Sequence, residues 1–358
     1  MNLALSDEQQ LFADGIGRFL EKRYAFEHRR QMVAEQRWGD PAIWSALAEL
    51  GCFGIAVPET AGGFGGGSVE IGLMMRALGR HLAIEPVAAA VVAGTLLGGT
   101  EGADDLIEAL IGGEMRLAPC FDLVCGVSGV SGSARSLAGG HAAHGLLAAC
   151  EQSLHLVDPA DVRVTPVPLL DDTIGVDVVA EDAPSRRLEV GADWPRHRAL
   201  AIARGQLARA WQALGVLEGA LDATTAYMRE RRQFGRPLGA FQTIQHRVAE
   251  MTVAAKEAEV AAMLGALVLD AAGPGADAER ALSAATGRIA AASAIVAETA
   301  VQLHGGMGVS DELDISARFR HLQAFRFRAE AVEQPVERYA EAVVASGAHH
   351  HSAVLVEA

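Results

Sequence analysis

Long helical segments with few breaks dominate the C-terminal part of this 358-residue chain. Residues 196–304 contain only two prolines, and apolar residues recur there at helical spacing in alanine-rich sequence. We expect one helix over about Ala199–Glu230 and a second after Pro237, because proline suits the first turn of a helix. A third is expected over Ala278–His304, where Gly305 and the glycine after it end the helix. Long helices with short connections predict an antiparallel bundle.

Two further regions precede this bundle. The first is mostly helical: it begins with a capping box, Ser6 followed by Gln9, and is interrupted by the glycine-rich loop Phe53–Gly67. The second contains short β-type runs separated by Asp, Pro and Gly. We therefore predict a mainly α fold with a small β domain: an N-terminal helical domain (1–114), a middle β domain (115–195), a C-terminal helical bundle (196–346) and a tail (347–358).

Composition and charge exclude several classes of function. The net charge of -15 argues against nucleic acid as a partner, because a phosphate backbone needs a basic face. The N-terminus lacks the basic start and apolar run of a signal peptide, and no stretch of about 20 residues is apolar enough to span a bilayer. The four cysteines have neither CxxC nor zinc-type spacing. We expect free thiols, no metal site and a cytoplasmic protein, and we assign no metal role to His349–His351, which are native or tag-derived.

The turn after the first long helix concentrates positive charge. Its sequence over residues 229–247, RERRQFGRPLGAFQTIQHR, holds five arginines in an acidic protein. One interpretation is a solvated helix end, since cations are favourable near a helix C-terminus. The other is a binding site for an anion, because guanidinium groups pair well with phosphate and carboxylate. This segment alone does not distinguish the two.

Three segments, in this order and spacing, resemble the acyl-CoA dehydrogenase family, and the resemblance covers most of the chain. They are WSALAELGCFGIAVPETAGGFGGG (44–67), YMRERRQFGRPLGAFQTIQHRVAEM (227–251) and AVQLHGGMGVSDE (300–312). The resemblance implies FAD, bound in an extended form across a dimer interface. It assigns contacts with the adenosine and pyrophosphate of the neighbouring subunit's FAD to Arg231, Phe234, Gln242, Gln302, Gly305 and Gly306.

These roles make chemical sense for the residue types. Arg231 offers a planar set of donors to a pyrophosphate, and Phe234 can lie against flat or apolar parts of the cofactor. The two glutamine amides can bond polar groups, and the glycine pair lets backbone amides approach closely. The presence of both motifs favours an anion site over a solvated helix end. We expect His304 to have a packing or supporting role.

The catalytic base of the family is not found at its expected positions. In this family a glutamate removes the α-proton of an acyl-CoA while a hydride leaves the β-carbon for the flavin. Counted without gaps from the QLHGG segment, the usual position falls on Ala329, and the position used by a minority falls on Gly205. Glu330 is displaced by one residue, about 100° on a helix. It is a candidate base only if the backbone shifts, and is otherwise a solvent-facing carboxylate.

The middle domain also departs from the family. The stretches TEP…GSD and KxWIT are absent, and a Gly/Ser-rich run occupies Gly126–Gly140. The half that begins at His141 still resembles the family. We expect the first half to be truncated and to lack strands that a complete flavin pocket needs.

The retained residues are those that a subunit lends to its neighbour's FAD, and the lost ones would serve its own flavin and substrate. In this respect the chain is similar to the shorter subunits of actinobacterial α2β2 acyl-CoA dehydrogenases that act on steroid side chains. We predict one subunit of an FAD-dependent complex in lipid degradation, with a partner subunit that carries the glutamate. Acyl-CoA is the expected substrate, and electron-transfer flavoprotein the expected acceptor. Two alternatives stay open: a self-sufficient homo-oligomer using Glu330, and an FAD-free structural subunit.

Overall fold

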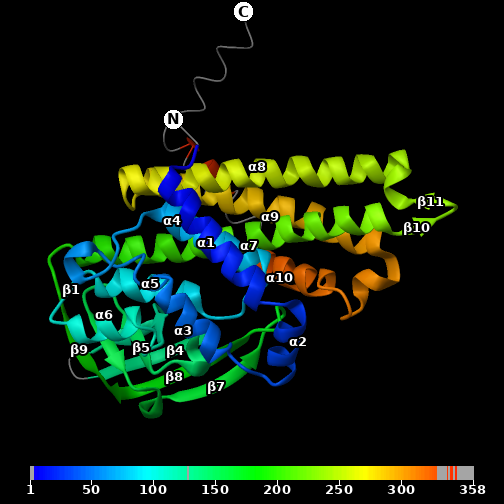
Figure 1. The fold of residues 1–358 in the computed structure, drawn as a ribbon. Coiled ribbons are helices and arrows are strands. Elements are labelled where there is room, and N and C mark those ends of the chain that lie inside the picture. The colour runs from blue at the N-terminus through cyan, green and yellow to red at the C-terminus, as the bar shows by residue number, and fades with distance from the viewer. Residues whose placement is uncertain (1–3, 127–128, 329–336, 338, 342, 345–358) are drawn as a thin grey trace, which may run out of the picture.

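The computed structural model describes residues 4–126, 129–328, 337, 339–341 and 343–344 (Figure 1). The predicted fold class, mainly α with a small β domain, is confirmed. The first helices are α1 (Asp7–Arg23), α2 (Phe26–Ala34), α3 (Pro41–Glu49), α4 (Ser68–Arg80), α5 (Val87–Leu97) and α6 (Asp104–Ile111). Within the part of the chain that the structure describes, no helix has both the length and the apolar character needed to cross a membrane.

Local sequence explains where these helices begin. The Ser6 hydroxyl accepts from the Gln9 amide at 3.2 Å, and the Gln9 side chain accepts from the Ser6 amide at 3.0 Å, so the predicted capping box is present. The Asp40 carboxylate caps α3, whose first residue is proline. Between α3 and α4, Phe53–Gly67 forms the predicted loop, with a single 3-10 turn at Glu59–Ala61.

The middle part of the chain forms two packed sheets (Figure 1). One has five strands in the order β1-β9-β6-β5-β2, and the other has four in the order β3-β4-β8-β7. Strands β2 and β5 pair in parallel, and the other pairs are antiparallel. The strands are β1 (Thr100–Glu101), β2 (Leu117–Cys120), β3 (Leu123–Cys125), β4 (Gly129–Ala138), β5 (Gly145–Ala149), β6 (Leu154–Val157), β7 (Arg163–Pro168), β8 (Ile174–Pro184) and β9 (Arg186–Val190).

Two expectations about this domain are wrong. The first half was expected to lack strands, but it forms β2, β3 and β4, and the Gly/Ser-rich run supplies most of β4. Alternating burial explains this, because Val130 and Ala134 point into the core between the sheets while serines face outward. The expectation of four free thiols is also wrong. Cys125 at the end of β3 and Cys150 just after β5 form a disulfide that joins the two sheets, while Cys52 and Cys120 are free and buried.

The C-terminal part is a helical bundle of α7 (Trp194–Glu230), α8 (Gln242–Ala272), α9 (Ala276–His304) and α10 (Ile315–Phe327). The predicted stop at Gly305 is confirmed, since this residue caps α9 with a φ of 60°. The predicted place of Pro237 in the first turn of the second long helix is wrong. Pro237 ends a short hairpin, and a 3-10 turn over Leu238–Ala240 separates it from α8.

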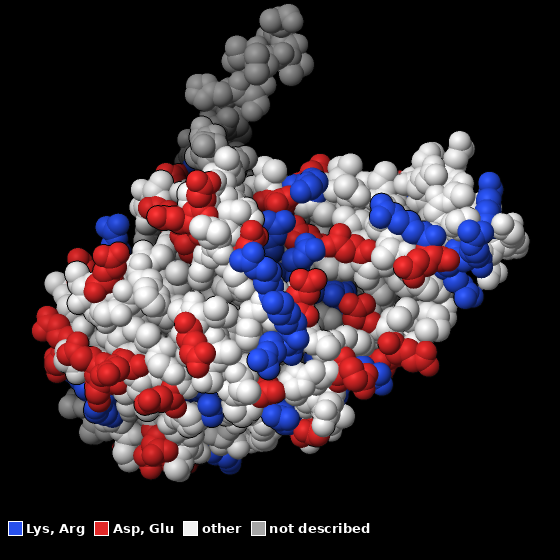
Figure 2. All heavy atoms as spheres, viewed as in Figure 1, with Lys and Arg blue, Asp and Glu red and all other residues white. Residues whose placement is uncertain are grey.

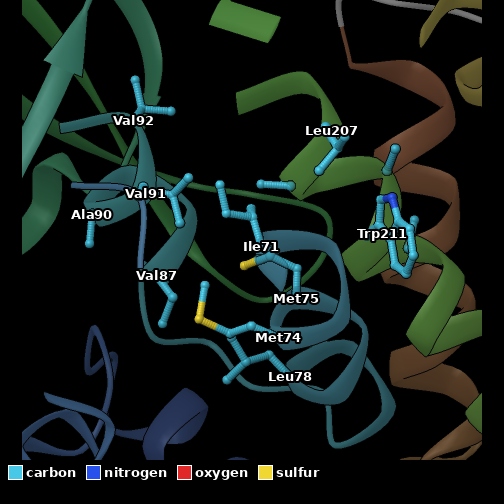
Figure 3. Close-up of a cluster of buried hydrophobic side chains, with 14 of the residues drawn as sticks. Ile71, Met74, Met75, Leu78, Val87, Ala90, Val91, Val92, Leu207 and Trp211 are labelled. Carbon is cyan, nitrogen blue, oxygen red and sulfur yellow. The ribbon is translucent and has the colours of Figure 1, made fainter. Parts of the chain in front are cut away.

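A close crossing of α4 and α7 joins the N-terminal helices to the bundle. A Cβ atom added to Gly79 of α4 would overlap the carbonyl oxygen of Gln212, and one added to Gly215 of α7 would overlap the carbonyl oxygen of Arg76. The two backbones therefore touch. Trp211 packs beside this crossing, against Gly72. Figure 3 shows the surrounding apolar side chains of α4, α5 and α7.

The close crossing predicts that replacing glycine by alanine changes the free energy of unfolding differently at different glycines. We expect Gly79→Ala or Gly215→Ala to lower the free energy of unfolding by about 1–3 kcal/mol, because the extra methyl group forces packed backbones apart. Gly15→Ala on α1 is the matched control. Its Cβ would meet no atom within 4 Å, so this change should stabilise the helix by roughly 0.5–1 kcal/mol. Urea unfolding followed by circular dichroism measures all three, and equal effects would contradict the close crossing.

Candidate cofactor-binding site

The arginine-rich turn is a tight hairpin between α7 and α8. Arg231 follows the last residue of α7, and its carbonyl accepts from the Leu238 amide at 2.8 Å, which closes the turn. Strands β10 (Arg232–Gln233) and β11 (Arg236–Pro237) pair around a two-residue loop. Both loop residues have positive φ, 52° for Phe234 and 80° for Gly235, as in a type I′ turn. Glycine suits that conformation, but a bulky aromatic residue there is strained.

Phe234 is held at the tip of this hairpin with its ring in solvent. The side chain is 88% exposed, and it contacts the ring of Phe241 edge-on at 6.2 Å. The guanidinium of Arg236 stacks over the same Phe241 ring at 3.9 Å. A strained, exposed aromatic residue adds nothing to the chain's own core, so its placement favours a contact with something outside this chain.

A second element, the end of α9, approaches the hairpin. Gly305 needs its positive φ to end the helix. Gly306 does not have a positive φ, and a Cβ at either residue would have no neighbour within 4 Å. A helix stop therefore accounts for Gly305 only. At Gly306 the absence of a side chain leaves the backbone open to the outside.

These two elements line an open pocket of about 420 Å³. Four of the six predicted cofactor residues line it: Arg231, Gln302, Gly305 and Gly306. The other two do not. Phe234 lies at the hairpin tip, and Gln242 is the exposed first residue of α8. The structure thus brings the two sequence motifs together at one place, although they are about 70 residues apart in the sequence.

The contact that holds the two motifs together was not predicted from the sequence. The rings of Tyr227 and His304 stack at 4.4 Å with 20° between their planes, and both line the pocket. The available signal was spacing, because Tyr227 precedes Arg231 by about one helical turn. This stack attaches the end of α7 to the end of α9.

The protonation of His304 follows from its surroundings. The side chain is 6% exposed, and burial lowers its pKa below the ordinary value. Its Nδ1 lies 2.8 Å from the carbonyl oxygen of Ala300, which can only accept, so Nδ1 carries the hydrogen. The neutral ring leaves Nε2 as an acceptor at the pocket.

The pocket has an available positive charge. The Arg231 guanidinium makes no hydrogen bond or ion pair with any other residue in the described part of the chain. By contrast, Arg76 on α4 pairs with both Glu218 and Glu259. Figure 2 shows the basic side chains that gather at the end of the molecule carrying β10 and β11. Such a guanidinium, beside backbone that no side chain covers at Gly306, is suited to an anion.

Of the two expected base positions, one can be examined. Gly205 is buried on α7, and a Cβ there would lie 2.9 Å from Val92 Cγ2 of α5. The neighbouring Arg204 extends into the same packed region and donates to the carbonyl oxygens of Ala56 and Gly66 at 3.1 and 3.3 Å. A glutamate at position 205 would therefore have no space. Residues 329–330, with the candidate base Glu330, and the tail histidines 349–351 lie outside the described residues.

Two arginines, one within α10 and one just after its last residue, hold this helix against the β domain. Arg328 pairs with Asp171 at 2.8 Å, and Arg320 pairs with Asp172 at 2.9 Å. Burial raises the pKa of Asp171, but Arg328, His321 and the hydrogen bonds from Thr173 together lower it by more, so the net shift is downward and the carboxylate stays charged. Both aspartates lie in the turn between β7 and β8. No pattern in the sequence predicted this contact.

Comparison with known protein families decides the identity of the chain. The model described as "Acyl-CoA dehydrogenase, N-terminal domain" matches residues 6–103, and the one described as "Acyl-CoA dehydrogenase, C-terminal domain" matches residues 196–329. Together they match more than half of the sequence. The chain belongs to the acyl-CoA dehydrogenase family. Members of this family are oxidoreductases, and the matched C-terminal segment contains every residue predicted to bind the cofactor.

Individual relatives agree with this assignment. Acyl-CoA dehydrogenase IpdE2 of Mycolicibacterium smegmatis is 29% identical over 322 residues, which cover 88% of this chain and 92% of the relative. Among solved structures, the Tcur3481–Tcur3483 steroid ACAD has a TM-score of 0.85 at 23% identity, and the match covers 96% of this chain and 99% of that one. The ChsE4–ChsE5 complex from Mycobacterium tuberculosis has a TM-score of 0.85 at 24% identity, with the same coverage. These two likenesses show the fold.

The strained hairpin tip gives a test of what Phe234 is for. We expect Phe234→Asn to leave the chain's stability unchanged or to raise it by up to about 1 kcal/mol, because asparagine tolerates positive φ better than phenylalanine. The same change should weaken any ligand or partner contact made at the tip. Thermal unfolding of the isolated chain measures the first effect. A clear loss of stability would mean that Phe234 packs within its own chain.

Proposed function

We propose that this chain is one subunit of an FAD-dependent acyl-CoA dehydrogenase complex. It binds the adenosine and pyrophosphate part of an FAD whose flavin ring is held mainly by a partner subunit. The partner also supplies the glutamate that removes the α-proton. The observation that carries the proposal is the pocket that joins Arg231, Gln302 and the Gly305–Gly306 backbone at the outer end of the bundle. This pocket is formed at a place separate from the filled region around Gly205.

The pocket has groups that suit each part of such a ligand. Arg231 would pair with the pyrophosphate, and the open backbone at Gly306 would let the phosphates approach closely. Gln302 at the pocket and Gln242 at the start of α8 would bond polar groups of the adenosine portion. Phe234, projecting from the hairpin, would cover an apolar part of the cofactor where the subunits meet.

Bound FAD supplies the hydride acceptor for α,β-dehydrogenation of an acyl-CoA. The residues of this chain bind and orient the cofactor, and none of them is assigned a proton transfer. Arg231 would pair with the phosphate charge, and the backbone at Gly306, which has no side chain, would let the phosphates approach closely. The Tyr227–His304 stack keeps these two elements together. Electron-transfer flavoprotein is the proposed acceptor of the electrons, and the cytoplasm is the proposed location.

Two comparisons support a mixed assembly. The ChsE4–ChsE5 structure is a complex of two named components, and the Tcur3481–Tcur3483 protein is a steroid ACAD. Both have the fold of this chain over almost its whole length. We therefore propose a heterotetramer and, as the substrate class, a CoA thioester of a steroid side chain.

One test of the proposed function concerns Arg231. In the complex with its partner, Arg231→Ala should weaken FAD retention at least about tenfold, because one charge-assisted bidentate pair contributes about 1.5–3 kcal/mol. Arg231→Lys should give an intermediate result, since lysine keeps the charge but not the planar set of donors. Bound flavin after gel filtration and fluorescence titration of FAD measure this.

A matched control is Arg280→Ala. This change removes the same charge from the other end of α9, about 36 Å from His304 at 1.5 Å per residue, where Arg280 pairs with Asp277 at 2.5 Å. FAD retention should be unaffected. If Arg231→Ala also leaves FAD in place, the FAD-free structural subunit becomes the better interpretation.

Another test asks whether this chain or its partner holds the flavin and supplies the catalytic glutamate. The chain purified alone should be colourless and inactive, whereas the chain purified with a partner encoded beside it should be yellow and should oxidise acyl-CoA. Glu330→Gln should leave the turnover of the complex unchanged. A yellow, active protein from this chain alone would overturn the proposal, and loss of its turnover in Glu330→Gln would identify a self-sufficient homo-oligomer.

A further inference from the structure

A second cavity, of about 860 Å³, lies where α1, α4, α7 and α10 meet. Its lining contains none of the predicted cofactor residues. Four arginines line it: Arg18, Arg76, Arg80 and Arg318. The volume lies in the range of about 300–1,000 Å³ that is usual for small-molecule pockets.

Two of these arginines are held in place by carboxylates from neighbouring helices. Arg76 donates from Nε and Nη2 to Glu218 at 2.8 and 2.5 Å, and from Nη2 to Glu259 at 2.9 Å. Arg80 donates to Glu218 at 3.2 Å and also pairs with Asp222. Burial lowers the pKa of Arg76, but Glu218 and Glu259 together raise it above the ordinary value, so the guanidinium stays charged. The cations are therefore fixed before any ligand arrives.

The third arginine, Arg18, comes from α1 and is available. It is exposed and makes no hydrogen bond or ion pair with any other residue that the structure describes. Lys22 and Arg23 follow in the last turn of the same helix. Figure 2 shows a band of basic side chains near the centre of this face, over the later part of α1. On a chain with a net charge of -15, such a band concentrates positive potential and attracts anions.

A glycine of α1 leaves this cavity open. Gly17 lies inside the helix and lines the cavity, and a Cβ there would meet no atom within 4 Å. Glycine inside a helix costs about 0.5–1 kcal/mol relative to alanine, and no packing contact requires it here. The missing side chain therefore leaves room for something other than this chain. Gly15 is equally free of neighbours but does not line the cavity.

We propose that this cavity binds a small phosphorylated anion of nucleotide size. Arginine guanidinium groups match phosphate oxygens in pairs, and Arg18 and the unused Nη1 of Arg76 are the available donors. The cavity is also lined by three carboxylates, Asp14, Glu21 and Asp222. These carboxylates would repel a ligand that carried only charge, but they accept hydrogen bonds from hydroxyl groups. In a phosphate joined to a hydroxylated sugar, the phosphate would pair with the arginines and the hydroxyl groups would donate to the carboxylates.

Calorimetric titration of ADP and of inorganic pyrophosphate into the full chain tests this. Because the cofactor pocket proposed above also binds such groups, the titrations use the Arg231→Ala background. There, ADP binding should persist, and it should weaken at least about tenfold in Arg18→Gln, which removes a charge-assisted contact, and in Gly17→Leu, which fills the cavity. Gly15→Leu, a change of the same size on the same helix, should leave the affinity unchanged.

The outcomes separate this proposal from the proposed function. If Arg231→Ala alone abolishes ADP binding, the anion belongs to the cofactor pocket and the second site is overturned, while the cofactor proposal gains support. Equal affinities in Gly17→Leu and Gly15→Leu would also overturn it, as would the absence of binding at millimolar ADP. If Arg231→Ala changes nothing and Gly17→Leu removes all binding, the second site holds and the cofactor role of Arg231 is weakened. Circular dichroism confirms that each variant is folded.

Discussion

The backbone contact between α4 and α7 at Gly79 and Gly215 is the constraint on which the rest of the structure depends. Because no side chain separates the two helices, α7 belongs both to the N-terminal core and to the C-terminal bundle. Its position fixes both of its ends. The first turn packs on the β domain through Trp194, whose indole donates to the Cys150 carbonyl at 3.0 Å. The last turn carries Arg231 to the pocket. A helix of 37 residues, held at its middle and its start, places that arginine on a rigid base.

The same crossing also assembles the second cavity. Gly215 lies against the backbone of Arg76 and Arg80, which are one helical turn apart on α4. Their side chains therefore meet the carboxylates that follow on α7, Glu218 and Asp222. Arg318 of α10 passes over Gly219 and donates to the carbonyl of Arg80, which adds α10 to this cluster. A single pair of glycines thus determines both the packing of the domains and the geometry of the fixed cations.

Sequence reasoning succeeded where the signal was local. The cap at Ser6 and the stop at Gly305 depend on a few adjacent residues, and both were predicted. It failed where a contact joins distant segments. The Cys125–Cys150 disulfide exists because two sheets pack face to face, and the pairing of Arg328 with Asp171 joins segments 157 residues apart. The cofactor pocket is an intermediate case. Four of its residues were predicted from family motifs, but the Tyr227–His304 ring stack could be recognised only from the three-dimensional structure.

The tight packing around Gly205 bears on how this chain and its proposed partner would keep separate roles, with the catalytic glutamate only in the partner. A glutamate there would have to displace Val92 of α5, whose Cγ2 would lie 2.9 Å from the added Cβ, while Nη1 of Arg209 would lie 3.8 Å from it. Forcing extra atoms into a well-packed core typically costs about 1–3 kcal/mol. One substitution at this position therefore cannot create a working base without damage to the core. The cofactor pocket, by contrast, lies at an exposed end of the bundle and places no such demand on the core. In the proposed complex, this chain can keep its contacts with the partner's cofactor while its own interior is packed for stability.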